Sequence, residues 1–215
     1  MRGTIFFMNE IIESNKVEIA GTVVSTLRFS HEVLGEKFYE CYVQSNRLSG
    51  KDDILPVTIS DRIGMDVSLG KRIFVKGQLR SYNKYDDLIG RSRLILTVFA
   101  RDLRELDETE SDKNEVVLHG YLCKTPVYRT TPFNREICDM LLACNRAYQK
   151  SDYIPLISWG RNARLARDQE VGDEIEILGR LQSREYVKQT EDGAEQRTAY
   201  EVSVSNMKIG EGVKI

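Results

Sequence analysis

The pattern of hydrophobic and polar positions predicts a protein built almost entirely from β-strands. In the second half of the chain, five strand-length segments are rich in apolar, β-branched and aromatic residues, and polar or turn-forming stretches separate them. These segments are 116–123, 137–143, 153–159, 174–186 and 198–207. The first half shows the same order at 17–24, 38–43, 54–60, 72–82 and 92–101.

Only one segment, 161–169, has the pattern of a helix, and it falls between the third and fourth strands of the second half. Its counterpart in the first half, 61–67, is shorter and contains Gly64, which disfavours a full helix. Five strands with a helix after the third is the order of the OB-fold, a small Greek-key barrel. We therefore expect an all-β protein of two tandem OB-folds, each a five-stranded Greek-key barrel with one short helix between strands 3 and 4.

The two halves also repeat one another residue by residue. Seven residues recur 99 positions later, namely Asn15, Val17, Gly21, Asn46, Arg47, Pro56 and Arg62. Four more recur 102 positions later, namely Gly70, Gly77, Leu79 and Ser81. A period near 100 residues is too long for a solenoid and matches one small domain. We expect domains at 1–107 and 114–215, joined by an acidic linker at 106–113, while the apolar opening segment 1–14 has no counterpart in the second half.

Composition narrows the classes of function. The 31 basic and 33 acidic residues leave a net charge of −2, so there is no global basic excess, although basic residues can still cluster on one face. Neither a membrane span nor an export signal is recognisable, which predicts a soluble cytoplasmic protein. The four cysteines, Cys41, Cys123, Cys138 and Cys144, lie in apolar runs without C-x-x-C spacing, which favours buried free thiols over a metal site or disulfides.

Catalytic chemistry finds no support in the sequence. His31 and His119 are the two histidines, and they do not occupy matching positions in the two halves. Two unmatched histidines are too few for a metal cluster and do not suggest a Ser-His-Asp arrangement, and the sequence has no phosphate-binding glycine motif. We expect no enzyme, no metal and no cofactor.

The second half resembles the bacterial single-stranded DNA-binding proteins. The resemblance runs in order through most of this half, over Asn114, Val116, Leu118, Gly120, Pro126, Tyr128-Arg129, Thr131-Pro132, 143–146, Tyr153, Trp159-Gly160, 179–186 and 198–204. It implies non-catalytic, largely sequence-independent binding of single-stranded DNA in replication, recombination or repair.

The resemblance also implies which side chains stack on bases. The stacking positions of the family are occupied here by four aromatic residues, Tyr148, Tyr153, Trp159 and Tyr186. An unpaired base on an aromatic ring contributes about 1–3 kcal/mol, whatever the base. The alternative for any one of them is an ordinary aromatic residue of the barrel core or rim.

The first half serves as an internal control for these positions. The repeat places four non-aromatic residues there, Ser49, Ile54, Ser60 and Lys84. We infer that the second half binds the strand and that the first half has weakened or changed its contacts. Tyr82 and Tyr85 lie close to the fourth of these positions, so a shifted hairpin alignment would restore one stacking ring there. The second strand of the first half carries three more aromatic residues, Phe38, Tyr39 and Tyr42.

Basic residues must then contact the phosphates. The candidates lie on the first loop, at strand ends and on the last hairpin: Lys124, Arg129, Arg146, Lys150, Arg180, Arg184, Lys188 and Arg197. Each of them is equally compatible with a solvated surface charge. Arg161, Arg164 and Arg167 are spaced by three and share one helix face, which we interpret as facing solvent.

The resemblance sets expectations about assembly and partners. Members of the family assemble four barrels as a homotetramer, so a chain with two barrels predicts a homodimer. Their acidic tail recruits replication proteins, and this chain ends at 211–215, soon after the second barrel, which puts recruitment through such a tail in doubt. The alternative function is an OB-fold interaction module of the replication or restart machinery with weak DNA binding.

Overall fold

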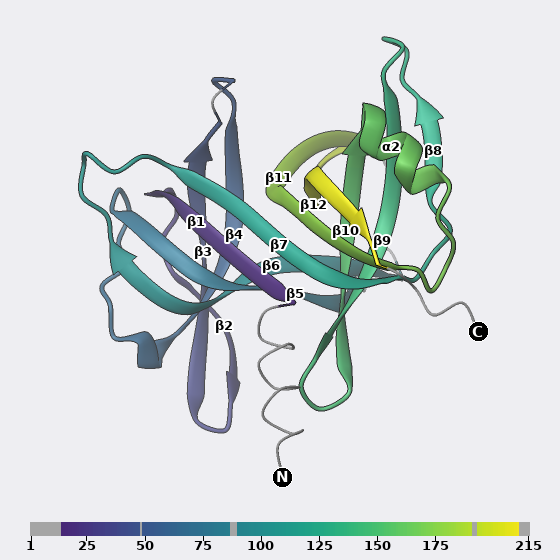
Figure 1. Ribbon diagram of the computed structural model, residues 1–215. Helices are drawn as coiled ribbons and strands as arrows, with labels where there is room; N and C mark the ends of the chain where they lie inside the picture. The colour runs from purple at the N-terminus through teal and green to yellow at the C-terminus, as the bar shows by residue number, and fades with distance from the viewer. Residues whose placement is uncertain (1–13, 48, 87–89, 191–192, 211–215) are drawn as a thin grey trace.

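The computed structural model describes residues 14–47, 49–86, 90–190 and 193–210 of the 215-residue chain. The described part is mostly β-structure, as the hydrophobic pattern predicts (Figure 1). Residues 1–13 and 211–215, on which the sequence raised expectations, lie outside it.

In the first half, five strands pair in a closed circuit. Antiparallel pairs join β1 to β3, β3 to β4, β5 to β6 and β1 to β5, and a parallel pair joins β4 to β6. A sixth strand, β2, extends the circuit by pairing with β3. The strands are β1 (Asn15–Val23), β2 (Arg28–Val33), β3 (Glu36–Asn46), β4 (Asp52–Ser60), β5 (Arg72–Asp86) and β6 (Arg91–Glu105).

The second half has the same pairing, including the parallel pair, here between β10 and β12. Its outer strand β8 pairs with β9. The strands are β7 (Lys113–Leu122), β8 (Val127–Thr130), β9 (Glu136–Arg146), β10 (Lys150–Trp159), β11 (Glu174–Thr190) and β12 (Gly193–Ile209). The sequence analysis missed β2 and β8, since nearly all their residues are exposed and show no apolar alternation.

The two halves differ in the segment after the third strand of the circuit. In the second half it is the helix α2 (Gly160–Arg167), which buries Ala163 and Ala166 and leaves the three arginines of the helix exposed, as predicted. In the first half it is a single 3-10 turn, η1 (Asp61–Ile63), ended by Gly64 at a φ of 68°. The expected short α-helix is therefore reduced to one turn there. Neither described helix has the length and apolar character needed to cross a membrane.

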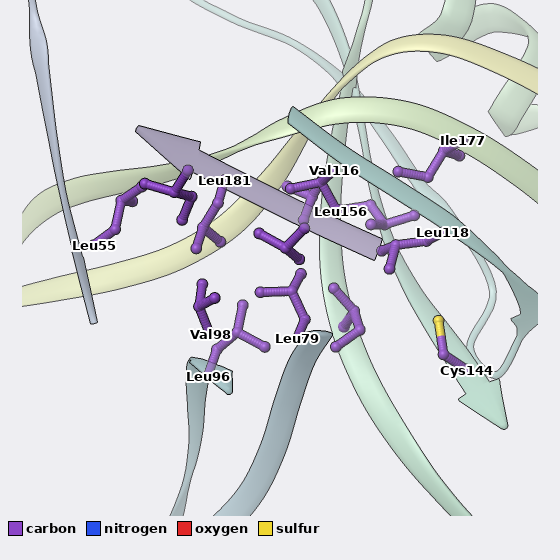
Figure 2. Close-up of a cluster of buried hydrophobic side chains, with 14 of the residues drawn as sticks. Leu55, Leu79, Leu96, Val98, Val116, Leu118, Cys144, Leu156, Ile177 and Leu181 are labelled. Atoms are coloured by element: carbon purple, nitrogen blue, oxygen red, sulfur yellow. The ribbon is translucent and has the colours of Figure 1, made fainter. Parts of the chain in front are cut away.

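Strands β1 and β7 join the halves along an antiparallel pair, side by side at the centre of Figure 1. In this pair Val17 faces Val116, its own equivalent in the repeat. A local two-fold axis therefore passes between these two residues. Buried apolar side chains of both halves form one cluster, in which Leu79 and Val98 of the first half accompany Leu181 and Val116 of the second (Figure 2).

The segment between the halves does not extend freely away from them. Arg72 on β5 donates hydrogen bonds to the carbonyl groups of Asp107 and Glu110 and to the carboxylate of Asp112 at 2.6 Å. Lys113, where β7 begins, bonds Glu18 on β1. The acidic linker is therefore held against the first half by basic side chains.

Asparagines of the repeat tie the start of each half to its own core. The side-chain amide of Asn15 donates to the carbonyl oxygen of Leu79 and accepts from its N–H, both at 2.9 Å. Asn114 makes the same pair of bonds with Leu181. In each half the asparagine therefore satisfies both backbone polar groups of a buried residue, which explains why asparagine recurs at this position of the repeat.

Glycines of the repeat mark the points where backbones cross closely. A Cβ atom on Gly21 would lie 2.1 Å from the carbonyl oxygen of Gln44, and one on Gly120 would lie 2.3 Å from that of Ala143. Here the first strand of each circuit leaves one neighbour for another, and only glycine permits the approach.

We expect Gly120→Ala to lower the free energy of unfolding by about 1–3 kcal/mol, because the backbone of β9 must move to admit the methyl group. Gly172→Ala is the control: a Cβ atom there would meet nothing within 4 Å, but the φ of Gly172 is +98°. This second variant therefore measures backbone strain without crowding. Urea unfolding followed by circular dichroism measures both. An unchanged midpoint for Gly120→Ala would contradict the close crossing.

Candidate nucleic-acid interface

Two of the predicted stacking residues lie on one face of β10. Tyr153 and Trp159 are 46% and 39% exposed, and between them Ile154, Leu156 and Ser158 point into the barrel. Because side chains alternate along a strand, Tyr153 and Trp159 share the outward face, about 20 Å apart at 3.3 Å per residue. Both rings are therefore open to a ligand, at two separate points along β10.

The other two predicted stacking residues lie on hairpins. Tyr148, in the β9–β10 turn, has a φ of 63°, uncommon for a residue other than glycine, and is 93% exposed. Tyr186 lies on β11, partly buried, with the guanidinium carbon of Arg184 5.7 Å from its ring centroid. All four rings are at least partly accessible, and none is a fully buried core residue.

The structure separates the predicted phosphate contacts into groups. Lys124 and Lys150 are exposed, and within the described ranges no carboxylate pairs with either of them. Arg129 pairs with Asp139 at 2.8 Å and Arg184 with Glu201 at 3.4 Å, and both guanidiniums are about half exposed. These four side chains remain open to a phosphate.

The other predicted phosphate contacts are less exposed, or their side chains lie outside the described part of the structure. Arg180 and Arg146 approach buried carboxylates at 3.0 and 3.7 Å. Arg197 is partly buried on β12 and already interacts with other groups, while Lys188 lies on β11 with its side chain outside the described atoms.

Two buried aspartates connect the halves, and the sequence analysis missed them. Asp53 on β4 is fully buried and accepts bonds from Arg180, at 3.0 Å, and from the N–H of Ser183, both in the second half. Arg47 completes the site through its Nε at 2.7 Å. The signal was present, because Asp53 recurs 99 positions later as Asp152.

Asp152 repeats this arrangement in the opposite direction. It is also fully buried, and it accepts from Arg80 at 2.8 Å and from the N–H of Ser81 at 2.8 Å, both in the first half. The Oγ of Ser81 accepts from the N–H of Tyr153 at 2.7 Å. The Asp152 pair therefore holds β5 of the first half against β10 of the second, next to Tyr153, and the Asp53 pair holds β4 of the first half against β11 of the second.

A groove of about 1260 Å³ lies mainly on the first half. Aromatic side chains of β2, β5 and β6 line it, and Tyr148 and Arg146 reach it from the second half. The first-half equivalents of the stacking positions contribute only Lys84, whereas the rings occupy other positions: Phe29, Tyr82, Tyr85 and Phe99. Tyr82 and Tyr85 were already noted in the sequence as rings close to the fourth position, whereas Phe29 and Phe99 were missed, Phe29 because β2 was not expected.

The cysteines are free thiols, in agreement with the sequence-based interpretation, and Cys41, Cys138 and Cys144 are buried. Burial raises the pKa of Cys41 and Cys138 to about 11 and that of Cys144 to about 12. Cys123 is only partly buried, and its pKa is raised mainly by burial.

These pKa shifts predict a loss of stability in alkali. A thiol whose pKa is raised by folding stabilises the folded state below the pKa of the unfolded chain, about 8.5, and loses that contribution as the pH rises. We expect the free energy of unfolding to fall between pH 8 and 10, and less steeply in a Cys144→Val variant. Equal pH dependence of the free energy of unfolding in both proteins, measured by urea titration, would contradict this account.

A thiol reagent at pH 8 should modify Cys123 first.

Residues 113–209 match the family described as the single-strand binding protein family, so the resemblance seen in the sequence is confirmed for the second half. The chain is 36% identical over 83 residues to single-stranded DNA-binding protein 1 of Lactococcus lactis, covering 35% of this chain and 55% of that protein. It is 35% identical over 83 residues to single-stranded DNA-binding protein A of Bacillus subtilis, covering 35% and 48%. The chain thus spans about half the length of these relatives.

The whole chain shares its fold with a solved structure. The wild-type single-stranded DNA-binding protein of Thermus aquaticus superposes with a TM-score of 0.71 at 20% identity, over 94% of this chain and 95% of that one. Both halves are therefore included in the similarity of fold, whereas the family match covers residues 113–209.

Proposed function

We propose that this protein binds single-stranded DNA with little sequence preference and without catalysis, starting from the match of residues 113–209 to the single-strand binding protein family. The observation that carries the proposal is the exposed pair Tyr153 and Trp159 on the outward face of β10. Rings in this position meet any base, because every base has a π-face.

Exposed basic side chains of the second half support the same proposal. Four of these side chains are exposed enough to contact phosphates: Lys124, Lys150, Arg129 and Arg184. For each phosphate contact, the logarithm of the binding constant falls with the logarithm of the salt concentration at a slope of about 0.7 for single strands. A net charge of −2 does not oppose this, since the charges act locally. We propose that Tyr148, Tyr153, Trp159 and Tyr186 stack on bases and that the second half is the main binding half.

We further propose that the chain consists of two tandem OB-fold domains, 1–107 and 114–215. The two closed circuits with equivalent pairing, including one parallel pair each, support this division. A cytoplasmic role in replication, recombination or repair, with replication proteins as further partners, follows from the proposed family function.

The single tryptophan makes the function directly testable. Titration with oligo-thymidine of about 35 nucleotides should quench Trp159 emission. This length is enough for two barrels, because one OB-fold binds up to about 16 nucleotides. The affinity should fall with salt, and duplex DNA should not compete. No quenching at low salt, together with nuclease-resistant capture of a replication protein, would favour the interaction module instead.

We expect a homodimer, which brings four barrels together. Within one chain, the β1–β7 pair already supplies one contact between barrels, so a dimer needs only a second kind of contact. Sedimentation equilibrium at micromolar concentration should give about twice the 24.7 kDa chain mass. A monomeric mass would contradict the dimer and leave the binding proposal unaffected.

A further inference from the structure

We propose that the groove of the first half is a second binding site for single-stranded DNA, built from residues that the second half lacks. The inference rests on the proposed function and extends it to the half that has no match in the family comparison. The groove measures about 1260 Å³ and is formed by strands of the first half together with the β9–β10 turn.

The rings that line the groove are accessible to bases. Phe29 on β2 is 60% exposed and Tyr85 on β5 is 58% exposed, while Tyr82, also on β5, is less exposed at 44%. Phe99 forms part of the same wall, with the guanidinium carbons of Arg101 and Arg80 at 5.1 and 6.0 Å from its centroid. Exposed rings beside guanidinium groups are the usual surface for unpaired bases.

The groove also contains positive charge without a fixed counter-charge. Within the described part of the chain, no carboxylate pairs with Arg101 or Lys84, and the hydrogen bond of Arg101 is a long one to Gln78, at 3.4 Å. Burial, and then the charge of Arg80, lower the pKa of Arg101. A phosphate in the groove would supply the missing negative charge.

The two carboxylates that line the groove are already engaged, and one of them, Glu36, is close enough to Arg101 to interact with it electrostatically. Glu36 accepts from Ser60 and pairs with Arg62 at 3.2 Å, and Glu40 accepts from Ser30 at 2.8 Å. Among the described residues, the lining cations without a paired carboxylate are therefore Lys84 and Arg101, and the β5–β6 register places them at two separate points along the groove. Phosphates are expected at these two points, and Tyr148 of the second half lines the same groove.

The corresponding surface of the second half lacks this chemistry. Strand register identifies the equivalent positions, since Thr58 faces Phe99 just as Ile157 faces Ser203. Ser203 thus replaces Phe99, and Glu201 replaces Thr97, where Gln182 donates a bond to it at 2.8 Å. A barrel of this kind folds without a ring at this position, so the Phe99 ring is available for a role other than building the barrel.

The groove reaches the β9–β10 turn of the second half, which precedes the strand that carries Tyr153 and Trp159. Tyr148 lies in the turn that precedes β10, and the same strand carries Tyr153. The backbone N–H of Tyr153 is bonded to Ser81, which lines the groove. One strand can therefore pass from Trp159 and Tyr153, past Tyr148, into the first half.

The test compares short and long oligo-thymidines on the full chain. In a Tyr82→Ala, Tyr85→Ala variant, affinity for an oligonucleotide of about 35 nucleotides should fall about tenfold or more for each ring. Quenching of Trp159 by an oligonucleotide of about 8 nucleotides should be unchanged, because that signal reports only the second half. The exposed Tyr121 on β7, outside the groove, provides the matched control as Tyr121→Ala.

Phe99→Ser gives the first half the serine that the second half has at the equivalent position, Ser203. This variant should weaken binding of the long oligonucleotide without unfolding the protein. Photocrosslinking with an iodouracil-substituted strand should label peptides that contain Phe29, Tyr82 or Tyr85. Unchanged affinity for the long strand in both variants, with no crosslink in the first half, would overturn the second site. Failure of the wild-type protein to bind any single strand would instead overturn the proposed function.

Discussion

Asp53→Ala is expected to lower the free energy of unfolding by about 3–5 kcal/mol. The substitution leaves the guanidinium groups of Arg47 and Arg180 beside a site that excludes water, and removing one partner of a buried ion pair is costly for this reason. Asp152→Ala should have an effect of the same size through Arg80 and Arg146. Urea unfolding followed by circular dichroism measures both.

The matched control for these variants is an aspartate at the surface. Asp66 pairs with Lys71 at 2.9 Å, but its side chain is 73% exposed, so Asp66→Ala should leave the unfolding midpoint within experimental error. Because each buried aspartate is held by the other half, the two halves should also unfold in one transition. Two separate transitions in the wild-type protein, or a change for Asp53→Ala no larger than that for Asp66→Ala, would contradict the proposed connection.

Replacement of Tyr153 and Trp159 together by alanine should weaken binding of single-stranded DNA by about 2–6 kcal/mol, the sum of two stacking contributions. The side chains face outward from β10, so the fold should be retained. Fluorescence anisotropy of a labelled oligo-thymidine is the appropriate measurement, since this variant has lost the tryptophan.

The repeat provides the control for this pair. Ile54 occupies the position equivalent to Tyr153 and is also 46% exposed, and Ser60 occupies the position equivalent to Trp159. Changing Ile54 and Ser60 should have little effect, because neither carries a ring and neither lines the groove. An equal loss from the two pairs would show that the halves bind through equivalent positions, which argues against the asymmetry proposed here.

Particular elements show how far the sequence could be followed. The ten main strands and the helix after Trp159 were predictable, since their apolar residues recur with the period of strand or helix. The outer strands β2 and β8 were not, because an exposed strand held by one neighbour has no apolar alternation. The helix expected in the first half became the single turn η1, where Gly64 takes a left-handed conformation.

The stacking candidates of the second half could be named from the resemblance, and the structure leaves their rings accessible. The phosphate candidates could be predicted less well, because the sequence does not show which basic side chains pair with a carboxylate in the folded protein. Arg180 illustrates this, since its guanidinium group is bonded to Asp53, 127 positions away. Only folding brings such a pair together.

The sequence by itself determined that two related β-rich halves follow one another and that the second carries the aromatic positions of the family. These properties are local, since they follow from the alternation of side chains and from spacing along the chain. The tertiary structure decided how the halves meet through β1 and β7, which charges are buried, and where the groove lies. Each of these depends on contacts between residues far apart in the chain, and the groove joins Phe29, Tyr85, Phe99 and Tyr148 from four different segments.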